Sequence, residues 1–407
     1  MLKSVSVENV TTLLRSLCFY SLLYMNPIQA APDKSALIEI HISYLKLNVS
    51  QAPALSNVIE QAEDSGLQGA QLAINDSNTT GNFLKQAFVL HYKDFNLKQE
   101  LMAQIALDVK DGQQLFIVDA PMDTLIEINR WAEGRQVLIF NVNESSDLLR
   151  YQVCLASVLH TTPSDAMKSD AIAQWLLNRR FNQVLLLSGK RGEDIALTDS
   201  FKRSAKRFGL KIVAEKSWSF DTDLRRSAQQ EVPLFTQTRD DYDVVYVADK
   251  SKDFAEYLPF NTFLPRPIAG SAGLEALSWH FVIEQWGAAQ LQNRFRALAA
   301  RNMNELDFSA YLAVRSVAQA VHQQKTAHYP ALITYIKSND FELAAYKGRK
   351  LSYRHWSGQL RMPMALVQPH GLVSLSPQTG VLHPNTELDT LGFDIQESQC
   401  DPQKRSL

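Results

Sequence analysis

The chain has 407 residues, of which 45% are hydrophobic and 21% charged, and its formal net charge at neutral pH is −2. This composition is typical of a globular protein with material for two or three domains. It lacks the basic excess of a nucleic-acid-binding surface, so we expect no nucleic-acid partner.

The first 30 residues differ from the rest of the chain. Lys3 and Arg15 precede a short apolar run, residues 17–25, and small residues follow at Ala30. This pattern predicts a secretory signal peptide, residues 1–30, and therefore a mature protein in the periplasm that does not insert directly into the membrane. The alternatives are an amphipathic first helix or a membrane anchor, for which the apolar run is too short.

Strand and helix patterns alternate from residue 36 to residue 142. Apolar residues at every second position predict strands, and apolar residues at helical spacing predict helices. The expected strands are Ala36–Leu47, Ala87–Tyr92, Gln114–Val118 and Gln136–Val142; the expected helices are Leu55–Asn78, which Gly66 interrupts and residues 78–81 end, Lys98–Lys110, and Asp123–Ala132, which Asp123 caps. This βαβαβαβ order predicts a parallel sheet covered on both faces.

A short extended crossover, Tyr151–Pro163, then leads into a second unit of the same kind. Its expected elements are a helix capped by Ser164, a strand Gln183–Leu187, a helix Asp194–Phe208 ended by Gly209, a strand Leu210–Glu215, a helix within Arg225–Thr238 and a strand Asp243–Ala248. Two α/β units joined by a crossover indicate two lobes with a ligand-binding cleft.

The remaining third of the chain returns to both lobes. We expect a short strand in Ile268–Gly273, helices Leu277–Arg301, Phe308–Lys325 and Pro330–Lys337, and strands within Leu351–Ser374 that turn at Ser357 and Gly358. The predicted fold class is therefore α/β, with lobe 1 formed by residues 31–150 and about 270–338, lobe 2 by residues 158–265 and about 341–380, and a C-terminal tail at residues 381–407.

Four basic residues lie on the predicted helix Asp194–Phe208, namely Lys202, Arg203, Lys206 and Arg207. They form either an anion site or the solvated face of an amphipathic helix, and the second interpretation is favoured.

Two cysteines remain after removal of the signal peptide, and an oxidising compartment permits one disulfide between them. Cys154 lies in the crossover, and Cys400 ends a segment, Leu388–Cys400, with few apolar residues to hold it in place. We predict a disulfide between Cys154 and Cys400. The alternative is two unpaired thiols.

Motifs of enzymes, metal sites and cofactor sites are absent from the sequence. The nine histidines are scattered, Gly189–Gly192 lacks the rest of a phosphate-binding loop, and Gly270–Gly273 lacks the spacing of a nucleophile elbow. We therefore expect a protein that is not an enzyme and that uses no cofactor and no metal.

Ligands of open parallel sheets bind beyond the carboxyl ends of the strands, where small and polar groups gather. The candidate ligand-binding residues at these positions are Ala120, Asp123, Thr124, Asn141, Asn143, Glu144, Ser145, Lys190, Asp249 and Ser271. Alternatively, Asp123 and Ser145 serve only as helix caps.

The order of these elements resembles the type 1 periplasmic binding proteins of the branched-chain amino-acid group. More specifically, the chain is similar to the substrate-binding component of the ABC transporter associated with pyrroloquinoline-quinone-dependent alcohol oxidation. The stretches that carry this similarity are residues 66–84, 158–167, 207–215, 279–295, 341–363 and 383–394.

The resemblance implies a two-lobed periplasmic protein that captures a small-molecule ligand and delivers it to an ABC permease in the inner membrane, in connection with quinoprotein alcohol catabolism. The alternative is a ligand-sensing or structural partner of a periplasmic dehydrogenase system. Residues 120–124, 141–145 and 189–192 differ from the Ser, Thr, Gly and Tyr of the amino-acid binders. The sequence therefore leaves the chemical class of the ligand open. The candidates are an amino acid, an alcohol, an aldehyde-derived metabolite, a cation and a metal complex.

Overall fold

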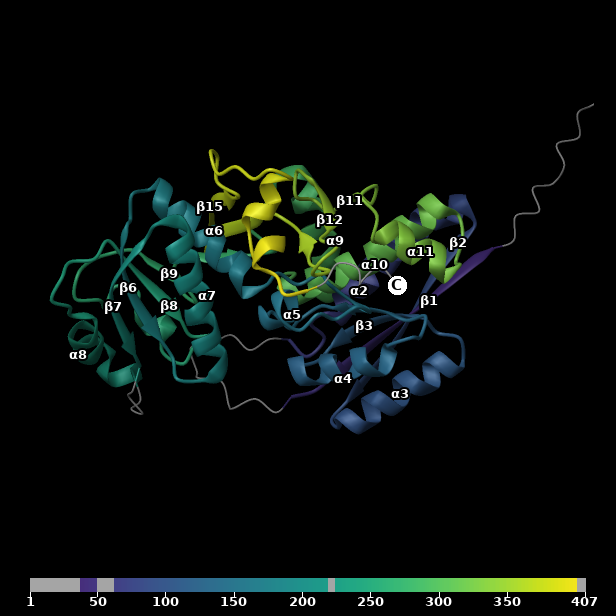
Figure 1. Ribbon diagram of the computed structural model, residues 1–407, viewed down its shortest axis with the longest axis horizontal. Coiled ribbons are helices and arrows are strands. Elements are labelled where there is room, and N and C mark those ends of the chain that lie inside the picture. Colours follow the sequence, from purple (N-terminus) through teal and green to yellow (C-terminus); the bar gives the residue numbers. More distant parts are fainter. Residues whose placement is uncertain (1–36, 50–61, 219–223, 401–407) are drawn as a thin grey trace, which may run out of the picture. The chain divides into compact units, whose positions relative to one another are not determined.

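The computed structural model describes residues 37–49, 62–218 and 224–400 (Figure 1). The predicted signal peptide, residues 1–30, and the first part of the predicted helix Leu55–Asn78 lie outside this range. Among the helices it describes, none combines the length and apolar character needed to cross a membrane.

The first sheet is parallel, and its described strands follow the order β2-β1-β3-β4-β5. The strands are β1 Ile38–Leu47, β2 Gln86–Phe95, β3 Leu115–Asp119, β4 Leu138–Asn141 and β5 Val158–His160. Every residue of β3 and β4 is buried, as expected where helices cover both faces. The predicted parallel sheet is confirmed.

Helices from distant parts of the chain cover the two faces of this sheet. One apolar cluster joins one face of the sheet to the helices α3 Lys98–Lys110, α4 Met122–Ala132 and α5 Leu148–Tyr151. A second apolar cluster joins other residues of the sheet to the helices α2 Leu67–Leu84 and α10 Glu305–Gln324. The helices α2 and α10 approach closely at Gly69, where an added Cβ would lie 1.9 Å from the carbonyl oxygen of Asp307. Only glycine fits there. Two further helices, α9 Ala288–Ala299 and α11 Tyr329–Ile336, contact α2 and α10 respectively.

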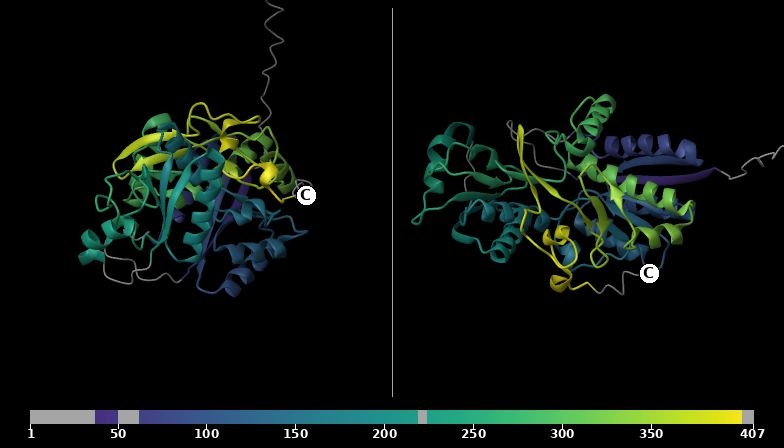
Figure 2. Two further views of the ribbon diagram at one scale, coloured as in Figure 1. Left: turned by 60° about the vertical axis from the view of Figure 1, so that its left-hand side comes forward. Right: turned by 90° about the horizontal axis from the view of Figure 1, so that it is seen from above.

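The second sheet is also parallel, in the order β7-β6-β8-β9, and it forms the core of the second lobe (Figures 1 and 2). Its strands are β6 Gln183–Ser188, β7 Lys211–Ser217, β8 Val244–Ala248 and β9 Ile268–Gly270; its helices are α6 Asp165–Asn178, α7 Gly192–Phe208, α8 Leu224–Thr236 and the short η1 Ala255–Tyr257. The Ser164 hydroxyl caps α6 by accepting from the Met167 amide at 3.3 Å, and Gly209 ends α7 with a φ of 73°. Both signals were read correctly from the sequence.

Two small antiparallel sheets complete the described part of the chain. One joins β10 Glu275–Leu277 to β14 Met364–Gln368 and β15 Gly371–Ser376, and the other contains β11 Leu343–Ala344, β12 Lys350–Tyr353 and β13 Leu360–Arg361. The predicted turn at Ser357 and Gly358 joins β12 to β13, and Gly358 has a φ of 67°. The two-lobed α/β fold predicted from the sequence is confirmed.

The predicted end of the first helix is wrong. The helix α2 begins after Gly66, whose φ is 85°, but it continues through residues 78–81 to Leu84. The turn-forming side chains bond within the fold and do not end the helix: Thr79 Oγ1 donates to the Asn75 carbonyl at 3.0 Å, and the Asn78 amide binds the backbone of Phe88. Tertiary contacts therefore override the local stop signal.

Two other predictions are also wrong. The predicted helix Leu277–Arg301 starts only at α9, because Trp286 and Gly287 have φ values of 54° and 83° and separate it from a non-helical stretch. The residue that precedes α4 is Pro121, so Asp123 lies in the first turn and makes no capping hydrogen bond. Pro121 has an extended backbone, with φ −69° and ψ 166°, and the helix begins at the next residue.

The C-terminal strap, residues 387–400, contains η3 Glu387–Thr390 and η4 Ile395–Glu397 and is drawn in yellow in Figure 1. It is held much more firmly than its few apolar residues predicted. Arg207 donates to the Gly392 carbonyl at 2.9 Å, and Arg203 donates to Glu397 at 2.6 Å and lies 4.2 Å from the centroid of the Phe393 ring. The interpretation of this helix face as solvated is therefore wrong for Arg203 and Arg207.

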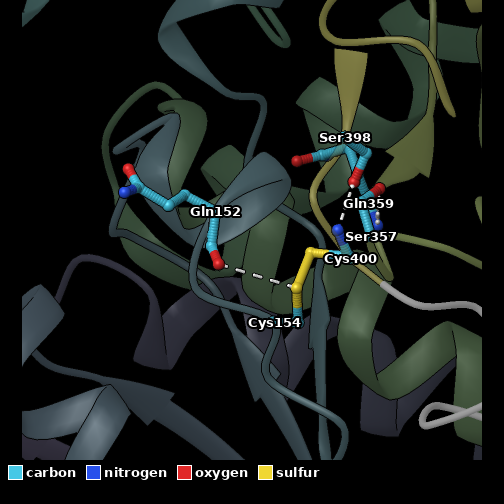
Figure 3. The surroundings of a disulfide bond; sticks show 6 residues. All are labelled: Gln152, Cys154, Ser357, Gln359, Ser398 and Cys400. Atoms are coloured by element: carbon cyan, nitrogen blue, oxygen red, sulfur yellow. Dashed lines mark hydrogen bonds between the residues drawn. A yellow bond between two sulfur atoms is a disulfide. The ribbon is translucent and has the colours of Figure 1, made fainter. Parts of the chain in front are cut away.

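The end of the strap is tied to the crossover that follows the first lobe. Phe393 stacks on Tyr151 with ring centroids 4.3 Å apart, and the Gln399 amide donates to the Tyr151 carbonyl at 2.7 Å. The predicted disulfide between Cys154 and Cys400 is present, with the two Cα atoms 5.4 Å apart (Figure 3). The strap thus connects α7 of the second lobe with the start of the crossover.

Candidate ligand-binding site

A cavity of about 750 Å³ lies beyond the carboxyl ends of strands from both parallel sheets. The loops after β4, β8, β9 and β10 line it, together with the N-termini of α6 and α10. This is the position in which open parallel sheets bind ligands, and the volume suits a small organic molecule.

Four of the predicted site residues line this cavity, namely Asn143, Ser145, Asp249 and Ser271. Asn143 donates to Asp119 at 2.8 Å, and the Ser271 hydroxyl accepts from the Asp249 amide at 2.9 Å. These hydrogen bonds therefore join the loop after β4 to the end of β3, and the loop after β8 to the loop after β9.

The other predicted residues lie outside the cavity lining. Ala120, just before α4, and Thr124, within α4, are buried, and Lys190 is exposed. The Asp123 side chain is 68% exposed and lies 3.5 Å from Lys98. These positions follow strands as predicted, but their side chains point elsewhere.

Asn141 and Glu144 instead shape the loop after β4. The Asn141 side-chain oxygen accepts from the Glu144 amide at 2.9 Å, and the Glu144 carboxylate accepts from the amides of Met122 and Ser146 at 3.1 and 2.8 Å. Both side chains are therefore engaged with the backbone.

A partly buried ion pair, Lys250 with the buried Asp165, lies in the wall of the cavity. Lys250 Nζ donates to Asp165 Oδ2 at 2.6 Å and to the Ser145 hydroxyl at 2.9 Å, and that hydroxyl donates to Asp165 Oδ1 at 3.0 Å. Burial lowers the pKa of Lys250, but the charge and hydrogen bond of Asp165, together with the charges of Glu144 and Asp147, outweigh burial and raise this pKa above its ordinary value. Burial, and then the charge of Asp165, raise the pKa of the nearby Asp147 to about 6.

A second network joins α6 to α10 and to the segment after β10. Lys168 donates to Glu305 at 2.6 Å, and the other oxygen of Glu305 accepts from the amide and hydroxyl of Ser278 at 2.6 and 3.0 Å. The amine of the buried Lys347 donates to the Ser278 carbonyl. Ser278 is therefore fixed from both sides, and it positions the residues that follow it.

Those residues form an apolar wall. Trp279, His280 and Phe281 line the cavity beside Leu277 and Tyr246. Trp279 stacks on Phe308 with ring centroids 4.7 Å apart, which anchors the wall to α10. The cavity thus combines polar loops on one side with an apolar surface on the other.

Sequence reasoning missed several lining residues for identifiable reasons. Asp165 directly follows Ser164, the predicted helix cap, and Lys250 directly follows Asp249, a predicted site residue. Their positions next to these residues are the sequence signal by which both lining residues could be found. The sequence pattern places Trp279 to Phe281 inside the predicted helix Leu277–Arg301. Glu305 lies in the first turn of α10, whereas the pattern predicts a helix that begins three residues later, at Phe308.

Replacing Lys347 by methionine is expected to remove a pH dependence of stability. Burial lowers the pKa of Lys347 to about 7, so above that pH the unfolded chain holds a proton that the folded protein lacks. Stability therefore rises with pH, by about 1 kcal/mol between pH 7 and pH 8 in the wild type relative to Lys347→Met. Urea unfolding across this pH range measures the difference.

The matched control is Lys350→Met, at a side chain that is 71% exposed. This variant should keep the pH dependence of the wild type. Parallel stability curves for the wild type and Lys347→Met would contradict the prediction.

Comparisons with known proteins agree with this architecture. The family described as periplasmic binding protein matches residues 55–230, and no curated protein matches the chain. Among solved structures, an ABC transporter substrate-binding protein from Sphaerobacter thermophilus is similar with a TM-score of 0.66 and 14% identity, over 83% of this chain and 97% of that one.

Two further structures have the same fold. A branched-chain amino acid ABC transporter periplasmic ligand-binding protein from Burkholderia xenovorans LB400 has a TM-score of 0.64 and 16% identity, over 81% of this chain and 90% of that one. A solute-binding protein of an ABC transporter from Rhodopseudomonas palustris BisB5, in complex with 3,4-dihydroxybenzoic acid, has a TM-score of 0.60 and 11% identity, over 81% and 93%. The chain therefore has the two-lobed fold of the type 1 periplasmic binding proteins, and residues 55–230 carry the sequence pattern of that family.

Proposed function

We propose that this protein is a periplasmic solute-binding protein that captures a small molecule in its cavity and delivers it to an ABC permease of the inner membrane. The observation that carries the proposal is the cavity itself, because loops from the ends of both sheets converge on it and combine polar groups with an apolar wall. The similar proteins from Burkholderia xenovorans and Rhodopseudomonas palustris are described as ligand-binding and solute-binding proteins of ABC transporters, which supports the proposal.

Binding without turnover is the proposed activity. The polar residues of the cavity bond to one another and to the backbone, as in the Lys250–Asp165 and Lys168–Glu305 pairs. Such an arrangement fixes loops and orients a ligand. After incubation with the protein, the ligand should therefore be recovered unchanged, which mass spectrometry can verify.

Ligand binding should stabilise the folded protein. A ligand that binds only the folded state at about 100 times its Kd adds about 2.7 kcal/mol of stability, so it raises the melting temperature. A thermal-shift screen of the mature protein, with calorimetry on the compounds that raise the melting temperature, measures this effect. Small-angle scattering should show a smaller radius of gyration with ligand, because the lobes of such a fold close by a hinge.

The matched variants are Phe281→Ala, at a partly exposed cavity residue, and Phe83→Ala, at an 86% exposed residue near the end of α2. The first should lose at least about tenfold in affinity, equivalent to roughly 1.4 kcal/mol, and the second should bind like the wild type. Equal affinity in both variants would place the ligand elsewhere, and conversion of the ligand would indicate an enzyme.

Export through a signal peptide is part of the proposal. Sequencing the N-terminus of the periplasmic protein should find Ala31, since the predicted cleavage follows Ala30. The link to quinoprotein alcohol catabolism rests on the sequence resemblance. A strain that lacks the protein should grow more slowly than its parent on a primary alcohol but equally well on an organic acid, and equal growth on both would remove the link.

A further inference from the structure

The charged side chains that line the cavity balance one another. The carboxylates are Asp165, Asp249, Glu275 and Glu305, and the cations are Lys168, Lys250, Lys252 and Arg301. The two sets are equal in number among the described lining residues. Burial lowers the pKa of His280, which also lines the cavity, and so favours the neutral form of its imidazole. The described lining thus has no net charge.

Each of these cations is also paired locally. The shortest distances are 2.6 Å for Lys250 to Asp165, 2.6 Å for Lys168 to Glu305, 2.9 Å for Lys252 to Glu256, and 2.6 Å for Arg301 to Asp307. Lys252 lies in addition 3.3 Å from Glu275, which lines the cavity. A carboxylate ligand would therefore have to compete with a carboxylate that the protein already supplies.

The remaining carboxylate, Asp249, is satisfied by the backbone. Its Oδ1 accepts from the Asp253 amide at 3.0 Å, and its Oδ2 accepts from the amides of Phe254 and Ala255 at 2.8 Å. Three N–H dipoles therefore stabilise its charge, and an ammonium group of a ligand would meet a carboxylate whose oxygens are engaged.

Hydrogen-bond donors for an uncharged ligand remain. An ammonium group has three N–H bonds, and the hydrogen bonds found for Lys250 and Lys168 use two and one of them, respectively. Hydroxyl or carbonyl oxygen atoms can accept from the others, while the wall of Trp279, His280 and Phe281 takes the carbon skeleton. A charged ligand group, in contrast, would lose its hydration, and every oppositely charged side chain that it met among the described lining residues would already be paired or hydrogen-bonded.

We propose that the cavity binds an uncharged molecule with an aliphatic or aromatic body and hydroxyl or carbonyl oxygen atoms, in preference to an amino acid, a carboxylate or an amine. This inference rests on the proposed solute-binding function and specifies the chemical class of its ligand.

The test compares probes that share a carbon skeleton and differ in charge. One series is 2-phenylethanol, phenylacetate and 2-phenylethylamine; the other is 3-methylbutan-1-ol, 3-methylbutanoate and 3-methylbutylamine; phenylalanine and leucine add the zwitterions. Calorimetry with the mature protein should give the alcohol of each series a Kd at least about tenfold lower than that of any charged relative.

Breaking one ion pair should change the preference in a predictable direction. Lys250→Met leaves Asp165 without its cation, so the amine should become the best ligand of its series. Asp165→Asn leaves Lys250 without its carboxylate, so the carboxylate should become the best. The double variant Asp165→Asn/Lys250→Met removes both charges, so it should again prefer the alcohol, and it avoids the loss of stability that an unpaired buried charge causes.

Each outcome separates the inference from the proposed function. A wild-type protein that binds an amino acid, a carboxylate or an amine more tightly than the matched alcohol overturns the inference and leaves solute binding intact. The absence of binding by every probe overturns the inference and removes support from the solute-binding function as well. An unchanged order of preference in both single variants would show that the Lys250–Asp165 pair does not control ligand charge, and would also overturn the inference.

Discussion

Replacing Asp389 by alanine is expected to lower the free energy of unfolding by about 3–5 kcal/mol, because it leaves two buried arginines without their carboxylate. Asp389 is fully buried in the C-terminal strap, and it accepts from Arg354 at 2.9 Å and from Arg361 at 2.7 Å. Burial raises the pKa of Asp389, but the charges of the two arginines outweigh it and hold this pKa below its ordinary value. The strap therefore depends on this ionised group.

Urea unfolding at neutral pH measures the loss, and Glu387→Ala is the matched control. Glu387 lies in the same short helix, η3, and also pairs with an arginine, Arg349, but its side chain is 42% exposed. Removal of an exposed pair of this kind should cost less than about 1 kcal/mol. Similar losses in the two variants would contradict the distinction between buried and exposed pairs in the strap.

Removal of the disulfide between Cys154 and Cys400 is expected to have a comparable effect. The bond joins residues 246 positions apart, and loop-closure entropy alone predicts a stabilisation of up to about 5 kcal/mol for so long a loop. The double variant Cys154→Ser/Cys400→Ser should therefore melt at a much lower temperature than the oxidised protein. Scanning calorimetry of both proteins, with and without a reducing agent, measures the difference.

The reducing agent supplies the internal control. It should lower the melting temperature of the wild type to that of the double variant and leave the double variant unchanged. The stacked pair of Phe393 and Tyr151 should keep the strap in place near the crossover after reduction, so ligand binding should persist. Recovery of both cysteines as free thiols from periplasmic material, alkylated without prior reduction, would contradict the bond.

The sequence predicted the two sheets well because their pattern is local. The strands β3 and β8 are buried along their whole length, and their continuous apolar runs are characteristic of parallel strands between two layers of helices. The stop signal after Asn78 failed for the opposite reason. Its polar groups find partners on β2 and within α2, and such partners cannot be read from a local window.

The candidate site was predicted less well than the fold. The rule of strand ends selected loops that line the candidate cavity, and four of the ten proposed residues are among the lining residues. It could not give the direction of each side chain, so the exposed Lys190 was included and its counterpart Lys250 was omitted. Lys250 and Asp165 are 85 residues apart, and their pairing follows from the arrangement of the second lobe, not from spacing along the chain.

The small number of apolar residues in the strap predicts a weakly held segment, unlike the one that the structure shows. Its contacts are mostly polar, and they use Arg203 and Arg207 on α7, which sequence periodicity places on a solvated face. An amphipathic pattern shows which face of a helix is polar, but it does not show whether another segment of the chain covers that face.

The packing of α2 on α10 also determines the order in which the first lobe can form. The amide of Gly66 donates to Asp307 across 241 residues of sequence, so the side of α2 that packs on α10 stays uncovered until residues beyond 305 have been synthesised. Contacts with so large a sequence separation raise the contact order and slow folding. Until α10 docks, this apolar side of α2 is open to aggregation. The lobe that begins first along the chain is therefore completed only after most of the second lobe has been made.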